Sequence, residues 1–200
     1  MLQHSVGILI RPQQTWSHLA TQGEGEHAKL LVYPLLLAPL PALAWFWGTT
    51  HIGWSVGASE AVTRLTPESA RLISFLFYAG MITCIAAIGY FVHWMADTYG
   101  ADSSINKGIM LASICATPLF FTGLVGFYPI LWLDMLVGVA AISWSVYLLY
   151  LGIPIVMDIP ESRGFLFASA VVAISLVIFI CLLVATVMLW EWGAMPAFTD

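Results

Sequence analysis

Asp134 is a candidate functional residue because of its position in the sequence. It lies about one turn into an apolar stretch that begins near Ile130. An acidic group at that depth in a membrane could bind a proton or a cation and face other helices. The alternative is a carboxylate close enough to the lipid headgroups to stay hydrated, and the nearby Trp132 favours this interpretation because Trp prefers the headgroup region. We favour the hydrated carboxylate and keep Asp134 as the candidate for a transport site.

His93 and Asp97 form a second candidate site near the end of another apolar stretch. Their spacing of four residues puts both side chains on one face of a helix. The pair could share a metal ion or a proton, but two ligands do not complete a metal site, and no further His or Cys follows at ligand spacing. We favour a hydrogen bond at the helix end, and we expect no metal and no other cofactor.

Motifs of known enzyme chemistry are missing from the chain. There is no Ser-His-Asp set, HExxH motif, glycine-rich phosphate loop or pair of intramembrane aspartates. The three cysteines, Cys84, Cys115 and Cys181, lie inside apolar runs without the spacing of a metal or redox pair, so we interpret them as packing residues. We do not expect an enzyme.

The amino-acid composition indicates that most of the chain is surrounded by membrane lipid. Hydrophobic residues make up 60% of the 200 residues and charged residues only 8%, against about 25% in an ordinary soluble domain. The mean hydropathy is +0.92, which indicates an integral membrane protein with membrane lipids around it. The formal net charge of −5 leaves no basic surface for a phosphate backbone, so nucleic acid is excluded as a partner.

Five apolar runs predict an all-α integral membrane protein, a bundle of five transmembrane helices in one domain over residues 1–200. A tight hairpin joins spans three and four, because only Phe127, Tyr128 and Pro129 separate two runs that are each long enough to cross a bilayer. Residues 1–26 form a cytoplasmic or interfacial segment, in which a helix starting near Pro12 places Trp16 at the membrane surface. The predicted spans are residues 28–47, 70–96, 107–127, 130–151 and 164–190.

Prolines and small residues indicate how the spans pack. Three prolines in span one predict a kinked helix, because each removes a backbone donor. Two spans carry small residues at steps of three or four, a spacing that lets membrane helices approach closely. We expect these two faces to meet, and they could also mediate a homo-oligomer. The prolines are Pro34, Pro39 and Pro41, and the small residues are Gly108, Ala112 and Ala116 in span three and Gly138, Ala141 and Ser145 in span four.

Basic residues near the span ends favour a cytoplasmic N-terminus. Four lie on the N-terminal side of the membrane and two on the opposite side, and cytoplasmic loops carry the excess of Lys and Arg. With five spans, the C-terminus is then expected outside the cytoplasm. The four are Arg11, Lys29, Lys107 and Arg163, and the two are Arg64 and Arg71.

Three short motifs resemble those of the Yip domain family, in particular its short bacterial inner-membrane branch. They are RP followed by TW at residues 11–16, ATP at residues 116–118 and YLLYLGIP at residues 147–154. The resemblance covers nearly the whole chain and implies the five-span layout, but no catalytic residue. The acidic DLYGP-type motif of the eukaryotic branch is missing, which argues against a GTPase partner. The motif residues are Arg11, Pro12, Trp16, Thr117, Pro118, Tyr147, Tyr150, Gly152 and Pro154.

Three functions follow as hypotheses. The resemblance and the missing reaction motifs favour a non-enzymatic inner-membrane protein that organises membrane or recruits partners. The alternative is a small channel or transporter for an ion or small solute, which requires polar groups from several spans to converge at mid-membrane. A membrane enzyme is the least favoured and requires a third functional group facing His93 and Asp97.

Overall fold

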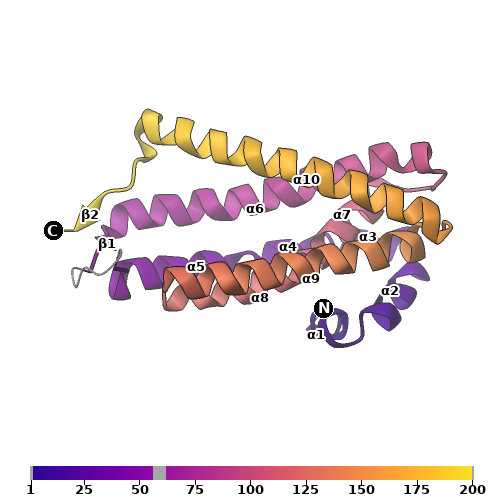
Figure 1. Ribbon diagram of the computed structural model, residues 1–200, viewed down its shortest axis with the longest axis horizontal. Coiled ribbons are helices and arrows are strands. Elements are labelled where there is room, and N and C mark those ends of the chain that lie inside the picture. Colours follow the sequence, from indigo (N-terminus) through magenta and orange to yellow (C-terminus); the bar gives the residue numbers. More distant parts are fainter. Residues whose placement is uncertain (1, 56–61, 200) are drawn as a thin grey trace.

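Long helices run side by side along one axis of the molecule in the computed structural model, which describes residues 2–55 and 62–199 (Figure 1). Within these residues, four helical segments are long and apolar enough to cross a membrane. A bent pair of helices supplies a fifth crossing when it is counted as one span. The predicted all-α membrane fold is confirmed. The four segments are Glu24–Ile52, Pro67–Tyr99, Leu131–Met157 and Glu161–Ala194, and the bent pair is Ile105–Cys115 with Thr117–Phe127.

The first long segment is broken where its prolines stand, as predicted. Because Pro39 has no N–H, the helical hydrogen bonds are interrupted there and a new helix begins at that residue. The Ala38 N–H still donates to the carbonyl of Pro34 over 2.9 Å, which closes the preceding turn. The resulting pieces are α3 (Glu24–Lys29), α4 (Val32–Leu37), α5 (Pro39–Trp47) and the π-helical turn η1 (Gly48–Ile52).

The second segment is α6 (Pro67–Ala96), which ends in the short 3-10 helix η2 (Asp97–Tyr99). Two local features stabilise the start of this helix. The Thr66 hydroxyl accepts a hydrogen bond from the Ser69 N–H over 3.4 Å, and Pro67 occupies the first helical position, where no N–H is needed.

The third span bends by 41°. It consists of α7 (Ile105–Cys115), α8 (Thr117–Thr122) and the 3-10 helix η3 (Gly123–Phe127). The bend falls at Pro118, which cannot donate to the carbonyl four residues earlier. After three intervening residues, α9 (Leu131–Met157) runs back along α8, so the predicted hairpin is confirmed.

Helix α9 is longer than the sequence suggested. We predicted that span four ends at residue 151, but α9 continues through Pro154 to Met157. The apolar side chains of Ile153, Val156 and Met157 are buried there, and their burial outweighs the hydrogen bond that the proline removes. Asp158 ends the helix in a left-handed conformation with φ of 51°.

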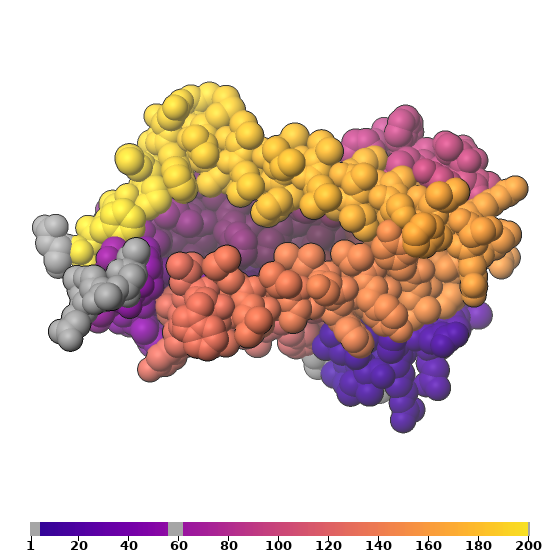
Figure 2. All heavy atoms as spheres, in the orientation of Figure 1, coloured from indigo at the N-terminus to yellow at the C-terminus, as the bar shows by residue number. Residues whose placement is uncertain are grey.

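The last long helix is α10 (Glu161–Leu189), followed by the π-helical turn η4 (Trp190–Ala194). Its first half packs on α9, where Gly164 lies against Pro154. Farther along, the two helices separate, and Figure 2 shows a hollow between them with α6 behind it. The second half of α10 therefore exposes apolar side chains on most of its circumference, as suits a helix that faces lipid.

A small antiparallel sheet joins two distant segments at the other end of α10. Strand β1 (Arg64–Leu65) pairs with β2 (Phe198–Thr199), and Trp54 forms an isolated bridge with Thr63. Two-residue strands show no periodicity, so the sequence did not predict them. The sheet places the C-terminal segment beside the residues that precede α6 (Figure 1).

The small-residue face of α7 is a helix contact, as expected, but its partner was predicted wrongly. A Cβ on Gly108 would lie 2.2 Å from the carbonyl oxygen of Gly89, so the face packs closely on α6 at this residue. A Cβ on Gly138 of α9 would meet nothing within 4 Å. Gly108 and Gly138 therefore do not pair with each other, because a suitable spacing alone does not select a partner.

Candidate functional site

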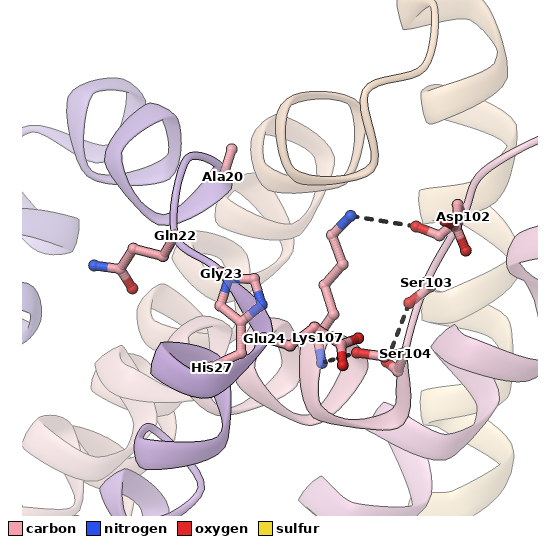
Figure 3. Close-up of a pocket in the computed structure, with 9 residues that line it drawn as sticks. All are labelled: Ala20, Gln22, Gly23, Glu24, His27, Asp102, Ser103, Ser104 and Lys107. Atoms are coloured by element: carbon pink, nitrogen blue, oxygen red, sulfur yellow. Dashed lines mark hydrogen bonds between the residues drawn. The ribbon is translucent and has the colours of Figure 1, made fainter.

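A polar hollow of about 300 Å³ lies between the turn that joins α2 (Pro12–Ala20) to α3 and the loop that enters α7 (Figure 3). Four ionisable side chains line it, two acidic, one basic and one histidine. They come from segments that are about 80 residues apart in the chain. They are Glu24, His27, Asp102 and Lys107.

Local hydrogen bonds hold the wall of this hollow in place. The Lys107 ammonium donates to the backbone carbonyl of Asp102 over 3.2 Å, and the Lys107 N–H donates to the Ser104 hydroxyl that caps α7. His27 is buried, and its Nε2 donates to the carbonyl of Leu19 over 3.1 Å, which ties α3 to the end of α2. The carboxylates of Glu24 and Asp102 are not used in this framework, so the hollow has a net negative charge suited to a polar or cationic group.

His93 supports the same hollow from behind. Its Nδ1 donates to the carbonyl of Ser103 over 2.8 Å, which fixes the α7 loop to the end of α6. This is the kind of helix-end hydrogen bond that the sequence favoured. Asp97 begins η2 and is exposed. Among the residues that the structure describes, no three His, Cys, Asp or Glu side chains lie close enough together to hold a metal ion.

Asp134 lies at the opposite end of the bundle, in the first turn of α9 just after the hairpin. A carboxylate is favourable there, because the N-terminus of a helix carries partial positive charge. Its Oδ1 is nevertheless buried and has no hydrogen-bond partner among the described residues. The sequence therefore located this side chain at a helix end, and the structure adds that one of its oxygens is shielded from solvent.

The most specific contact among the motif residues joins Trp16 to Gly152. Trp16 is fully buried, and a Cβ on Gly152 would lie 2.6 Å from its Cε2. Only a hydrogen atom on residue 152 leaves room for the indole. The indole is enclosed by protein where α2 packs on α9, so it does not face lipid headgroups, while the position of α2 at the membrane surface stays a prediction. Its Nε1 has no acceptor among the described residues.

A second contact joins the middle motif to the N-terminal helix α1 (Leu2–Ile10). The Tyr33 hydroxyl donates to the Ser5 hydroxyl over 3.0 Å and lies 2.7 Å from the Thr117 hydroxyl. All three side chains are almost completely buried. Burial of hydroxyl groups is tolerated here because they hydrogen-bond one another, and the trio links α1, α4 and α8.

The remaining motif residues shape the helices. Pro12 begins α2 after the exposed Arg11, Pro118 marks the bend of span three, and Pro154 packs on Gly164. The Tyr150 hydroxyl lies 2.9 Å from the Ser169 hydroxyl, which links α9 to α10. Tyr147 is about half exposed beside Trp144. The sequence identified these positions by resemblance, but it had no signal for Tyr33, Ser5 or Ser169, which are partners from outside the motifs.

The bundle of apolar helices and the contacts between its motif residues define a class of membrane protein. The chain belongs to the Yip1 domain family, because the family model of the Yip1 domain matches residues 6–182. It is 34% identical over 192 residues to the "Inner membrane protein YohC" of Escherichia coli strain K12, an alignment that covers 96% of this chain and 98% of the relative. The protein of the same name from Escherichia coli O6:H1 strain CFT073 matches with the same identity and coverage. No solved structure shows a significant match to the chain.

Proposed function

We propose that this protein is a non-enzymatic scaffold of the bacterial inner membrane, which holds an ordered N-terminal platform at the membrane surface and recruits a partner there. The platform consists of α1, α2 and α3. The name of the relatives, inner membrane protein, supports the location. The Yip1 domain family, to which the chain belongs, is not a known enzyme family.

This proposal rests on the contacts that the motif residues make. Trp16 and Gly152 dock α2 on α9. Thr117 lies at hydrogen-bond distance from Tyr33, whose hydroxyl donates to Ser5 and so docks α1 on the bundle. In an enzyme, residues of the defining motifs are expected to line a cavity and to include an acid, a base or a nucleophile. Here they stabilise the attachment of the N-terminal helices, which is the task expected of a platform.

The polar hollow is the part of the platform best suited to a partner. Glu24 and Asp102 are exposed, and their carboxylates lie in the hollow with one ammonium group (Figure 3). A basic or polar segment of another protein complements this charge. The balance of basic residues supports a cytoplasmic position for the hollow, with the β1–β2 end and the C-terminus outside.

Site-specific photocrosslinking in cells tests the proposal. A photoreactive residue replaces Glu24 in the hollow, and the control carries it at Leu183, which is about half exposed on the lipid-facing part of α10. We expect a discrete protein adduct at position 24 and none at position 183. Trp16→Ala, which removes the anchor of α2, should reduce the adduct at 24. A chain that is folded and inserted but gives no adduct at 24, or the same adduct at both positions, contradicts the proposal.

Orientation is tested separately. A reporter that is active only outside the cytoplasm, fused after Asp200, should be active, and the same reporter fused before Met1 should be inactive. The reverse pattern would place the hollow outside the cytoplasm and remove it from cytoplasmic partners.

Transport of a proton or cation is a second candidate function, and one observation supports it. The buried Oδ1 of Asp134 has no partner among the described residues, and an unpaired acidic oxygen inside a membrane protein is a feature of ion sites. Against this function, the buried hydroxyl trio of Ser5, Tyr33 and Thr117 hydrogen-bonds internally and does not join Asp134.

A further inference from the structure

An apolar groove of about 430 Å³ runs between α5 and α6, away from the polar hollow. Each helix contributes side chains at steps of three and four residues, so one face of each forms a wall. The walls include Ala42, Leu43 and Phe46 on α5, and Arg71, Ser74 and Phe75 on α6. Arg71 is the only charged residue among those that line the groove, and it lies near the start of α6.

The donors at this end of the groove are largely unused. The Arg71 Nε donates to the carbonyl of Pro67 over 3.3 Å, while its terminal nitrogens have no partner among the described residues. Glu68, three residues earlier on α6, does not come within ion-pair distance, since the single ion pair of the described part of the chain joins Lys29 to Glu26. The Ser74 hydroxyl, one turn farther along the same wall, also has no hydrogen-bond partner among these residues.

A cation and a hydroxyl at one end of an apolar channel match the chemistry of a phospholipid. We propose that this groove binds one anionic phospholipid, with its phosphate on Arg71 and Ser74 and an acyl chain along Leu43, Phe46 and Phe75. A guanidinium binds phosphate through paired N–H donors. The seven helical steps from Arg71 to Tyr78 extend the channel by about 10 Å along α6, which accommodates part of an acyl chain.

Charge selects the anionic class. The groove offers no carboxylate to the ammonium group of a zwitterionic headgroup, while Arg71 attracts any net negative charge. Leu43 and Phe75 are exposed on the two apolar walls. An acyl chain held between the walls makes more van der Waals contacts with them than mobile lipid does. This site would belong to the α5–α6 face and is separate from the platform.

The test uses the purified full chain in detergent, with native mass spectrometry to count bound lipids and measure apparent affinity. Phosphatidylglycerol is the probe and phosphatidylcholine is the zwitterionic comparison. We expect one phosphatidylglycerol to bind more tightly than phosphatidylcholine. Arg71→Gln should weaken it about fivefold and remove the preference, while Arg64→Gln, at a basic residue outside the groove, should have no effect.

A second pair of variants tests the groove itself. Leu43→Trp fills the groove at an exposed position and should prevent binding of both lipids, and Leu36→Trp, at a similarly exposed position outside the groove, should not. Equal binding of the two lipids by the wild type, or an unchanged preference in Arg71→Gln, overturns the proposed recognition of charge. Equal effects of Leu43→Trp and Leu36→Trp overturn the proposed groove, since they would mean that lipid binds all around the bundle.

Discussion

The indole of Trp16 lies against the backbone of Gly152, so close that a Cβ on residue 152 would be 2.6 Å from Cε2 of the ring. The two residues belong to motifs at opposite ends of the family resemblance. Their contact attaches α2 to α9, so the two motifs share one structural role. A large side chain needs a flat surface to pack against, and glycine in a helix provides it.

Gly152→Ala should therefore destabilise the protein. The added methyl group forces the buried indole to move, and overpacking of this kind costs about 1–3 kcal/mol of the free energy of unfolding. Gly80→Ala on α6 is the control, because a Cβ there would meet nothing within 4 Å. Thermal melting in detergent should show a lower midpoint for Gly152→Ala alone.

A double-mutant cycle separates this contact from a general effect on α9. Trp16→Leu removes the ring that the new methyl group meets, so the double variant should lose less stability than the sum of the two single variants. Additive losses would show that the methyl group at residue 152 acts on something other than Trp16.

The contact of α6 with α7 makes a second prediction. A Cβ on Gly108 would lie 2.2 Å from a backbone oxygen of Gly89, which cannot rotate away. We expect Gly108→Ala to separate the helices and to lower the free energy of unfolding by at least about 1–3 kcal/mol. Gly138→Ala should be neutral or stabilising, because nothing lies near that position and Ala has a higher helix propensity by about 1 kcal/mol. Unfolding by sodium dodecyl sulfate measures both, and equal behaviour of the two variants would refute the close approach.

The buried hydroxyl trio makes a third prediction, on dynamics. Tyr33→Phe leaves the Thr117 hydroxyl without the partner that it has in the structure, which should cost about 0.6–2 kcal/mol inside a membrane protein. Because Tyr33 also holds Ser5 of α1, the amides of α1 should exchange with deuterium faster in this variant. Tyr78→Phe, which removes a hydroxyl that has no partner among the described residues, serves as the control. Unchanged exchange of α1 in Tyr33→Phe would mean that the apolar contacts alone hold the helix.

Local signals explain what could be predicted from the sequence. The apolar runs and the short connection between spans three and four depend on neighbours in the chain, and the structure agrees with both. The end of α9 was missed because Pro154 and Gly152 read as a break, while burial of the following apolar residues keeps the helix intact.

Contacts between distant segments could not be predicted in the same way. The spacing of Gly108, Ala112 and Ala116 indicates a helix contact but contains no information on the partner, which proved to be Gly89. A Trp near a predicted membrane surface has two favourable positions, the headgroup region and a protein pocket. The choice of the pocket depends on Gly152, and the polar hollow likewise depends on a loop about 80 residues away from α3.

Asp134 distinguishes the two candidate functions and makes the last prediction. An acidic side chain with a buried, unpartnered oxygen is unfavourable unless it is protonated, binds a cation or reaches water. If the protein is a scaffold, Asp134→Asn should leave the fold intact and change the free energy of unfolding by no more than about 1 kcal/mol, since the first turn of α9 is near the bundle end.

Proton and cation flux into liposomes reconstituted with purified protein provides the measurement. We expect liposomes with the wild type and with Asp134→Asn to be equally impermeable, because the hydrogen bonds of the hydroxyl trio do not reach Asp134. Asp97→Asn, an exposed acid in η2 at the other end of α6, is the matched control. Flux in the wild type and in Asp97→Asn, together with its loss in Asp134→Asn, would refute the scaffold and make Asp134 the site of ion coupling.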